Sequence, residues 1–376
     1  MDKINIIGGG IAGLALAVHL EKANIEYQIF EQAASFKTVG AGILLANNAM
    51  QIFDQLDLSK KLTEKGNRTK TLNIVDQNLH IISSIDLTKF EQKFKVSNIA
   101  IHRADLQESL LDSISSESIH LDHQLKDMTE TDLIFQNGKT IPKGIVIGAD
   151  GIQSTVRKVL FGKKEIKFPG QICWRGVVDF TLPEKYTHQF NESWGDGCRF
   201  GFAQINSKQV YWFALCNYKN SVSEWDDRSW KQSFKTFHPL VVKLLQSTHA
   251  SSIHMAPISQ LEILKKWHHK SICLIGDACH AMTPNMGQGA GQGIEDAYTL
   301  SKCLQHTNSI EASFDLFQKL RYKKLKSIVK NSWHIGKIAQ LESKIGRTIR
   351  NTAFKSIPQF LTQSQSKRIF QLAEVK

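Results

Sequence analysis

The sequence lacks the features that mark several specialised classes of protein. No apolar run approaches the roughly 18 residues that a membrane-spanning helix needs. The first predicted strand starts at Ile4, which leaves no room for a signal peptide, so we expect a cytoplasmic protein. The six cysteines show neither CxxC spacing nor a matching set of histidines, so we expect reduced, mostly buried thiols, no disulfide framework and no bound metal. They are Cys173, Cys198, Cys216, Cys273, Cys279 and Cys303.

What remains is an ordinary globular composition with an excess of basic residues. With 376 residues, 41% of them hydrophobic, the chain can build one large or two medium domains. Its formal net charge of +12 suits nucleic acid, an acidic membrane surface or anionic cofactors, and charge alone does not choose among them. Basic residues concentrate from Lys319 to Lys330 and more sparsely from Arg350 to Lys355. This pattern indicates a C-terminal amphipathic helical region with a solvated basic face.

A glycine motif near the N-terminus predicts a nucleotide-binding turn. Gly8, Gly10 and Gly13 form G-x-G-x-x-G between an apolar strand at 4–7 and a helix that begins near Ile11. Gly8 permits the tight turn and Gly10 lets the backbone approach a pyrophosphate. Gly13 lets the helix pack closely against the strand.

The residues around this turn support a dinucleotide ligand. Ile11 and Ala12 begin the helix, whose free N–H groups and partial positive charge face the expected phosphates. Glu31 closes the second strand 18 residues after Gly13, where an acid is expected to hydrogen-bond the hydroxyls of an adenosine ribose. The sequence therefore predicts a βαβ unit that binds a dinucleotide.

Two later segments distinguish FAD from NAD as that dinucleotide. The first is GIVIGADGIQSTVRKVLF, an apolar strand over 144–149 that ends in Asp150-Gly151 and is followed by a helix. The second is SICLIGDACHAMTPNMGQGAGQGIEDAYTLSKCL, an apolar strand that ends in Gly276-Asp277. A loop follows it, and then Gly287-Gln288-Gly289 opens another helix.

The three motifs, in this order, resemble the three fingerprints of the group A flavoprotein aromatic hydroxylases. The resemblance extends from about Ile4 to about Trp333 and includes GAGILLANNA at 40–49, IHRADLQESL at 101–110 and CWRGVVDF at 173–180. It implies an α/β fold like that of p-hydroxybenzoate hydroxylase, with a Rossmann-like FAD-binding domain, an inserted antiparallel β-sheet substrate domain and C-terminal helices. The salicylate and urate hydroxylase branch of the family is the most similar.

The resemblance also implies roles for individual residues. Arg103 would neutralise the FAD pyrophosphate, and Asp277 would hydrogen-bond the ribityl chain. The turn from Gly287 to Gly289 would present N–H groups and a helix dipole to the flavin ring. Asp150 would lie near both the pyrophosphate and the nicotinamide cofactor. The other positions implied for FAD are Gly42, Leu106, Pro284, Gln288 and Ala290.

The segment between Gln171 and about Leu264 predicts the substrate side. Alternating strands, CWRGVVDF, RFGFAQI and VYWFALCN, with turns at 195–197 and 206–208, indicate a mostly antiparallel sheet. Arg199 and Tyr211 match an arginine and a tyrosine that line the substrate site in the urate branch, so we predict them as the catalytic residues. A three-residue hairpin loop would put them on one face and a two-residue loop on opposite faces, which the sequence leaves open. Asn285 replaces an aspartate of that branch, which counts against urate.

Together these features predict an FAD-dependent monooxygenase. In the resembled family NADH or NADPH reduces the FAD, and O₂ then forms a C4a-hydroperoxyflavin that hydroxylates a small aromatic or heteroaromatic substrate. The alternatives are an epoxidase or hydroxylase of an isoprenoid or quinone-like substrate, and a non-catalytic flavin-binding regulator.

We expect three parts in the chain. The FAD-binding domain takes residues 1–70, 98–168 and 268–335, the substrate domain takes 71–97 and 169–267, and a helical segment takes 336–376. We expect a monomer or homodimer with no nucleic-acid partner and no integral membrane segment. Peripheral membrane contact by the basic C-terminal region stays open.

Overall fold

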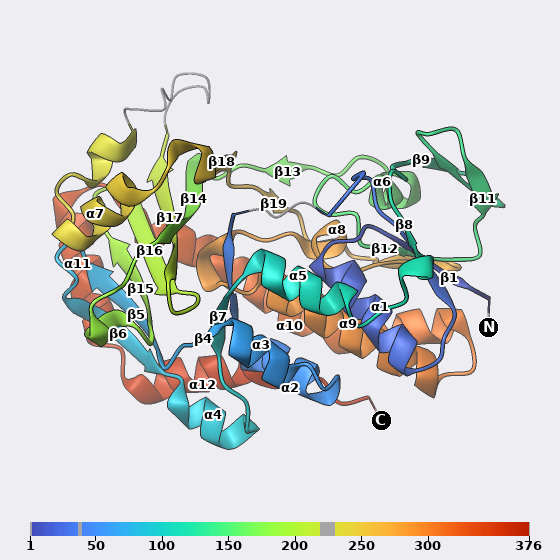
Figure 1. Cartoon of the computed structure of the whole chain (residues 1–376), viewed down its shortest axis with the longest axis horizontal. Helices are drawn as coiled ribbons and strands as arrows, with labels where there is room; N and C mark the ends of the chain where they lie inside the picture. The colour runs from blue at the N-terminus through green and yellow to red at the C-terminus, as the bar shows by residue number, and fades with distance from the viewer. Residues whose placement is uncertain (1, 37–39, 219–229, 376) are drawn as a thin grey trace.

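The computed structural model describes residues 2–36, 40–218 and 230–375. Two large sheets lie at opposite ends of an elongated molecule, with helices between and around them (Figure 1). This is the α/β class expected from the sequence. The six-stranded sheet has the order β20 (His268–His269), β21 (Ile272–Leu274), β12 (Ile145–Gly148), β1 (Ile4–Ile7), β2 (Tyr27–Phe30) and β8 (Ile119–His120).

The six-stranded sheet is parallel except for its edge strand β20. Its central strands β1, β12 and β21 are short and buried along their whole length, and all their residues except Asn5 are apolar or glycine, as in strands that are covered on both faces of a sheet. The helix α1 (Ile11–Lys22) follows β1, and α9 (Gly289–His306) packs against α1. Their N-termini lie at the carboxyl edge of the sheet, where open α/β sheets bind ligands.

The seven-stranded sheet is antiparallel apart from one parallel pair, β15 with β5. One face is an aromatic core under α7 (Pro239–Ser247), in which Trp174 stacks on Trp230 with 4.6 Å between ring centroids. The sheet has the order β18 (Ile253–Pro257), β14 (Gln171–Asp179), β17 (Gln209–Asn217), β16 (Cys198–Gln204), β15 (Gln189–Trp194), β5 (Thr71–Asp76) and β6 (Ile81–Asp86).

The β16–β17 hairpin settles the register that the sequence left open. The backbone N–H of Ile205 donates to the carbonyl of Gln209 (3.0 Å), so the loop contains the three residues 206–208. Arg199 pairs with Leu215, and Tyr211 lies four residues from Leu215 on the same strand. Because strand side chains alternate with a period of two, Arg199 and Tyr211 share one face, opposite the aromatic core.

Smaller elements connect the two large sheets. The three minor sheets are β3 (Gly42–Leu45), β7 (Ile99–His102) and β4 (Asn67–Arg68); β9 (Leu125–Met128), β10 (Asp132–Phe135) and β11 (Thr140–Pro142); and β13 (Ile166–Lys167) with β19 (Gln260–Leu261). The shorter helices are α2 (Asn47–Gln55), α3 (Ser59–Lys65), α4 (Thr88–Phe94), α5 (Arg103–Leu111), α6 (Thr155–Phe161) and α8 (Asp277–His280).

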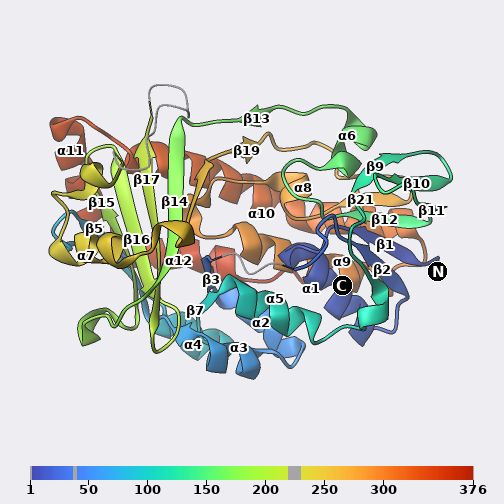
Figure 2. The same cartoon turned by 45° about the horizontal axis from the view of Figure 1, so that its top comes forward.

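Three C-terminal helices complete the molecule. The long helix α10 (Ile310–Ala339) runs from the six-stranded sheet toward the seven-stranded sheet (Figures 1 and 2). α11 (Lys344–Lys355) then packs against β6, and α12 (Gln359–Phe370) packs against β6 and α2. The basic run at 319–330 thus lies within α10 and the sparser one within α11. In the part of the chain that the structure describes, no helix is both long and apolar enough to cross a membrane.

The cysteines differ from the expectation of six reduced thiols. Cys198 and Cys216 lie directly opposite each other on β16 and β17, with 4.2 Å between their Cα atoms, and form a disulfide. The prediction was therefore wrong for this pair, because it depends on a strand register that cysteine spacing alone does not fix. The remaining four are buried free thiols.

Candidate active site

The glycine turn after β1 is shaped by close backbone contacts. Gly8 has φ +109°, and a Cβ there would lie 2.5 Å from the carbonyl oxygen of Ala149. A Cβ on Gly13 would lie 2.1 Å from the carbonyl oxygen of Gly8. A Cβ on Gly10 would meet no atom of the described chain within 4 Å. The first and third glycines are therefore required by packing, whereas the second leaves the backbone open to a ligand.

Glu31 holds this turn in place. Its carboxylate accepts hydrogen bonds from the backbone N–H groups of Gly9 (2.7 Å) and Ala33 (2.9 Å). The side chain is half-buried at the end of β2, beside the turn. Each oxygen can accept a further hydrogen bond, so the position suits the ribose contact expected from the sequence.

The N-termini of α1 and α9 are brought together by a second close contact. A Cβ on Gly293 of α9 would lie 3.1 Å from the Cβ of Ala12 on α1, and a Cβ on Gly276, which has φ +58° and precedes α8, would lie 2.9 Å from the same atom. Neither helix has a side-chain N-cap among the described residues, so their first N–H groups stay available. Gly287 and Gly289 likewise have open space where a Cβ would lie, as far as the described chain extends. Two uncapped helix ends at one sheet edge form a cradle for an anionic, phosphate-containing group.

Arg103 and Asp277 lie beside this cradle. Arg103 begins α5, where its backbone N–H donates to the carbonyl of Ala41 (2.8 Å), and its side chain is exposed. Asp277 begins α8 and attracts Arg103 electrostatically. Desolvation by the surrounding protein raises the pKa of Asp277, while His280 and Arg103 oppose that rise. A cation and a hydrogen-bond acceptor next to free N–H groups fit a bound FAD.

Asp150 mainly holds its own loop. Its carboxylate accepts hydrogen bonds from the hydroxyl of Ser154 and from the backbone N–H of Val156 (3.1 Å), at the start of α6. Burial raises its pKa. On the same helix the buried Arg157 donates to the carbonyl of Ala278 in α8 (2.8 Å). This hydrogen bond connects the segment that contains Asp150-Gly151 to the segment that contains Gly276-Asp277.

Of the other residues predicted to bind FAD, some lie in the apolar core and others lie near the start of α9. Leu106 and Ile11 are buried in the apolar core around the six-stranded sheet, where they pack. Ala290 lies half-buried in the first turn of α9, and Pro284 is exposed at the start of a short 3₁₀ turn, Pro284–Met286. Gln288 is buried directly before α9.

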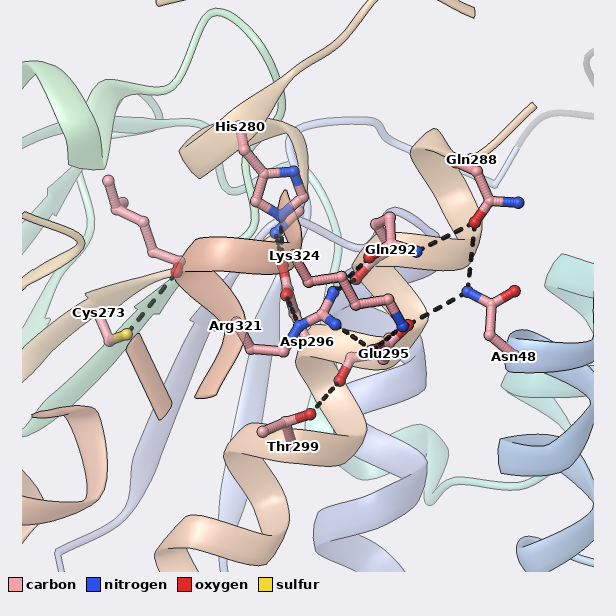
Figure 3. Close-up of polar contacts among 12 residues, drawn as sticks. Asn48, Cys273, His280, Gln288, Gln292, Glu295, Asp296, Thr299, Arg321 and Lys324 are labelled. Carbon is pink, nitrogen blue, oxygen red and sulfur yellow. Dashed lines mark hydrogen bonds and ion pairs between the residues drawn. The ribbon is translucent and has the colours of Figure 1, made fainter. Parts of the chain in front are cut away.

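A buried charged network lies beneath the cradle (Figure 3). Asp296 on α9 accepts from the backbone N–H of Gly276 (3.0 Å), from the Nε of Arg321 (2.8 Å), and pairs with the Nε2 of His280 (2.5 Å). Burial would raise the pKa of Asp296, but His280 and Arg321 outweigh it and hold the pKa below its usual value. Arg321 on α10 also pairs with Glu295 and donates to the side-chain oxygen of Gln292 (2.7 Å).

The same network reaches the C-terminal segment and the loop directly before α9, residues 281–288, which we call the flavin loop. Asn48 on α2 donates to Glu295 (3.2 Å) and to Gln288 (3.4 Å), as Figure 3 shows. Lys324 pairs with Glu295 (2.7 Å) and donates to the carbonyl of Gln371 (2.8 Å). Burial lowers the pKa of Lys324 to about 8, partly offset by Glu295. The residues at the start of α9 are therefore positioned by α2, α10 and the chain end.

Tyr211 lies at the boundary between the two large sheets. A Cβ on Gly42 would lie 2.4 Å from the Cβ and Cγ atoms of Tyr211, so only glycine allows this contact. Arg175 and, more weakly, Arg103 attract the Tyr211 hydroxyl electrostatically and act to lower its pKa. Burial raises the pKa of Tyr211, and Arg175 opposes that rise only in part. Gly42 on β3 therefore packs closely against Tyr211 on β17.

Arg199 joins three parts of the molecule. Its guanidinium donates to Gln340 after α10 (2.7 Å), to Glu192 on β15 (2.9 Å) and to Asn285 in the flavin loop (2.6 Å). Its side chain is only 1% exposed. Arg199 thus lies on the same face of the sheet as Tyr211, with each of its three nitrogen atoms engaged by the protein itself.

Sequence reasoning missed Arg175, Gln340 and the network around Asp296. Arg175 faces the same side of the sheet as Tyr211, because Val177 pairs with Tyr211 and Arg175 precedes Val177 by two. Strand alternation within CWRGVVDF therefore contained the signal for Arg175. Gln340 has no comparable signal, since it lies 141 residues from Arg199.

The fold and the site together define a class of protein. A parallel sheet with two uncapped helix ends, an adjacent Arg103–Asp277 pair and a second sheet facing them is the arrangement of the group A flavoprotein monooxygenases. The chain is an FAD-dependent monooxygenase of this group.

Comparison with known proteins gives the family. The family model described as "FAD binding domain" matches residues 2–324, so the chain belongs to this family. It is 31% identical to aurachin C monooxygenase/isomerase of Stigmatella aurantiaca over 374 residues, with 97% of each chain covered. It is 29% identical to 2-heptyl-3-hydroxy-4(1H)-quinolone synthase of Pseudomonas aeruginosa over 380 residues, again with 97% of each covered.

A solved structure shares the fold. HpxO of Klebsiella pneumoniae, complexed with FAD and uric acid, superimposes with a TM-score of 0.88 at 20% identity and covers 98% of this chain and 96% of that one. The sequence relatives correct one expectation: because they align over 97% of the chain, the similarity continues well beyond Trp333. The C-terminal helices contain no short motif that would have revealed this.

Proposed function

We propose that the enzyme hydroxylates a neutral bicyclic heteroaromatic ring with an apolar substituent, in the class of the 2-alkyl-4-quinolones. The observation that carries this is the state of Arg199, whose charge is already paired with Glu192 (2.9 Å) in a buried position. An anionic substrate would gain little from this arginine. A synthase named for a quinolone with a heptyl chain is also among the relatives that match over nearly the whole chain.

The remaining substrate face supports an apolar ligand. Tyr211, Phe213 and Phe190 present aromatic rings there, and Phe190 stacks on Phe213 with 6.1 Å between centroids. Val177 and Leu44 belong to the same apolar cluster. Stacking and apolar contact would orient a flat ring without requiring a charged partner.

We further propose that NADH or NADPH is the reductant and O₂ the oxidant. Bound FAD would supply the electron transfer and oxygen transfer. Arg103, Asp277 and the N-termini of α1 and α9 would hold its phosphates and ribityl chain. The Tyr211 hydroxyl, which like any tyrosine hydroxyl is protonated at neutral pH, would donate a hydrogen bond to the substrate. The apolar face would exclude water from the reaction.

The domain division expected from the sequence is part of this proposal. Strands β5 and β6, from segment 71–97, lie in the same sheet as β14–β18 from segment 169–267, which supports a discontinuous substrate domain. A cytoplasmic location and a monomeric or homodimeric state also stay predictions.

A substrate panel tests the proposal. NADH and NADPH oxidation by the purified, FAD-loaded enzyme would be followed with 2-heptyl-4-quinolone, 2-methyl-4-quinolone, urate, 6-hydroxynicotinate and salicylate. Hydrogen peroxide and the hydroxylated product would both be recorded. We expect the heptyl compound to stimulate oxidation most, with product formed in proportion to the reductant consumed. Productive turnover of urate or salicylate, with the quinolones inert, would overturn the substrate assignment.

The cofactor assignment has its own test. Asp277→Ala removes an acceptor for the ribityl chain, so we expect FAD affinity to fall by about tenfold or more. The dissociation constant would be measured by flavin fluorescence on the deflavinated protein. Asp112→Ala, which removes an exposed carboxylate at the end of α5, is the matched control. Unchanged FAD affinity in the Asp277 variant would remove this residue from the site.

A further inference from the structure

The exposed apolar side chains of this protein are unevenly distributed. Of the eleven large hydrophobic residues that are exposed in the described chain, seven lie between residues 338 and 361. We call the five on α11, on α12 and in the turn between them the C-terminal apolar surface. Its members are Ile345 (74% exposed), Ile349 (64%), Ile357 (38%), Phe360 (67%) and Leu361 (51%). Single exposed apolar residues are common on any protein, but a group of this kind marks an interaction site.

The side of α11 that faces the protein body explains why its isoleucines point outward. Arg350 is buried, donates to the carbonyl of Ala339 (2.7 Å) and lies over the ring of Trp194 at 5.0 Å. Phe354 contacts the same ring edge-on, with 5.1 Å between centroids. The contacts that anchor α11 therefore come from the face opposite Ile345 and Ile349, which leaves those two side chains without a role in the fold.

The charged residues of the segment that carries this surface are of one sign, although Arg347 on α11 pairs with Asp196 outside the segment (3.3 Å). From Ser343 to Ala373 the chain has six lysine and arginine residues and no aspartate or glutamate. Four of the six are exposed: Lys344, Lys355, Lys367 and Arg368. Lysine and arginine flanking outward-pointing isoleucine and phenylalanine is the composition of helices that lie in a membrane interface. Each exposed cation near an anionic leaflet adds to the attraction.

We propose that the C-terminal apolar surface docks on the surface of a lipid bilayer that contains anionic headgroups. The isoleucine, phenylalanine and leucine side chains enter the acyl-chain boundary, and the exposed cations contact the headgroups. A second copy of this chain fits less well, because a symmetric interface would bring two equally basic surfaces together. This inference is independent of the identity of the substrate.

The docking surface is physically connected to the substrate side. Trp194, which Arg350 and Phe354 contact, donates through its indole N–H to Glu192 (2.9 Å). Glu192 in turn pairs with Arg199 on the predicted substrate face. A bilayer that holds α11 would therefore lie only a few contacts from the proposed substrate face, which would help an enzyme whose substrate partitions into lipid.

Vesicle flotation with the full-length, FAD-loaded protein tests the proposal. Vesicles of phosphatidylcholine alone would be compared with vesicles that contain about one-third phosphatidylglycerol, at low and high salt. The test variant is Ile345→Glu/Ile349→Glu. The matched control is Val159→Glu/Phe168→Glu, which introduces the same charges at two exposed apolar positions away from the C-terminal helices. Flavin absorbance and thermal unfolding verify that each variant is folded.

We expect the native protein to float with the anionic vesicles and only weakly with the neutral ones. The isoleucine variant should lose about tenfold or more of its binding, and the control should bind as the native protein does. If the isoleucine variant is unfolded, Lys344→Glu/Lys355→Glu replaces it with the same expectation. Three results would overturn the proposal. They are no flotation of the native protein, equal flotation of all variants, or a dimer in sedimentation that only the isoleucine variant dissociates.

Discussion

The two ends of the molecule are stabilised in different ways. Beneath the cradle, Asp296, Glu295 and Arg321 are completely buried and are held by directed hydrogen bonds and ion pairs. Beneath the seven-stranded sheet, rings such as Phe200 and Phe202 fill a core by packing alone. Buried charges tolerate almost no displacement, whereas an apolar core can repack.

This difference in how the two ends are stabilised corresponds to the kind of ligand that each end would bind. A cofactor common to the whole family needs N–H groups in fixed positions, and a buried network specifies one geometry at the start of α9. Most of the apolar packing of the substrate sheet lies on one face, so on the other face the residues outside the Arg199 contacts can vary without loss of the fold. Directed hydrogen bonds and ion pairs therefore support the end that binds the cofactor, which is constant in the family. Apolar packing supports the sheet that faces the substrate, which varies.

The largest expected effect tests the network. Arg321→Met leaves Asp296 and Glu295 buried without their main cation, so we expect the free energy of unfolding to fall by about 3–5 kcal/mol. FAD affinity should fall as well, because Asp296 holds the N–H of Gly276. Urea denaturation and flavin titration would measure the two effects. Lys323→Met, at an exposed position on α10, should change stability by less than about 0.5 kcal/mol. If the Arg321 variant were as stable as the native protein and still bound flavin, the buried network would not be what stabilises the nucleotide end.

A smaller effect is expected from acid, at the nucleotide end. His19 is buried on α1 and tilts against Tyr298 of α9; burial, and then nearby lysines, lower its pKa from 6.5 to about 3. Below about pH 6.5 His19 is protonated in the unfolded chain, whereas in the folded chain it stays neutral until about pH 3. The free energy of unfolding should therefore fall with decreasing pH, by about 1.4 kcal/mol per pH unit across this window.

His19→Leu removes this titration, so its stability should depend less on pH. Urea denaturation at about pH 7 and pH 5 should show a difference of about 2 kcal/mol between the pH responses of the native and variant proteins. His249→Leu, at an exposed position, serves as the control. Identical pH responses in the native protein and the His19 variant would contradict the prediction.

The smallest effect is expected from the aromatic core. Phe202→Leu should reduce the free energy of unfolding by about 1 kcal/mol, because neighbouring rings can close much of the gap. FAD affinity should not change. The same substitution on the opposite face, Phe213→Leu, should instead raise the KM of the substrate. Loss of flavin from the Phe202 variant would show that the two ends are not separately supported.

The glycine turn after β1 was predictable from the sequence because each of its parts is local. Gly8, Gly10 and Gly13 lie in a strand–turn–helix context, and spacing alone assigns their roles. Strand limits followed from apolar runs, as with the strand expected over 144–149 and found as β12 over Ile145–Gly148. Local patterns of this kind need no knowledge of the tertiary fold.

The features that the sequence did not predict depend on contacts between distant segments. The partners of Arg199 are contributed by β15, the flavin loop and the end of α10, and nothing in the sequence near Arg199 indicates them. The Cys198–Cys216 bond required the hairpin register, which one residue more or less in the loop would change. Pairing of this type becomes visible only when the chain is folded.

The helix α10 joins the two ends at a fixed separation. Arg321 binds the network under the cradle, and Gln340, directly after the same helix, binds Arg199 on the substrate sheet. At 1.5 Å per residue these two anchor points are about 28 Å apart along the axis. Inserting one residue between them would turn one anchor by about 100° relative to the other, so neither site could be kept without losing the other. Evolution can therefore change the composition of this stretch freely on its outer side, but not its length.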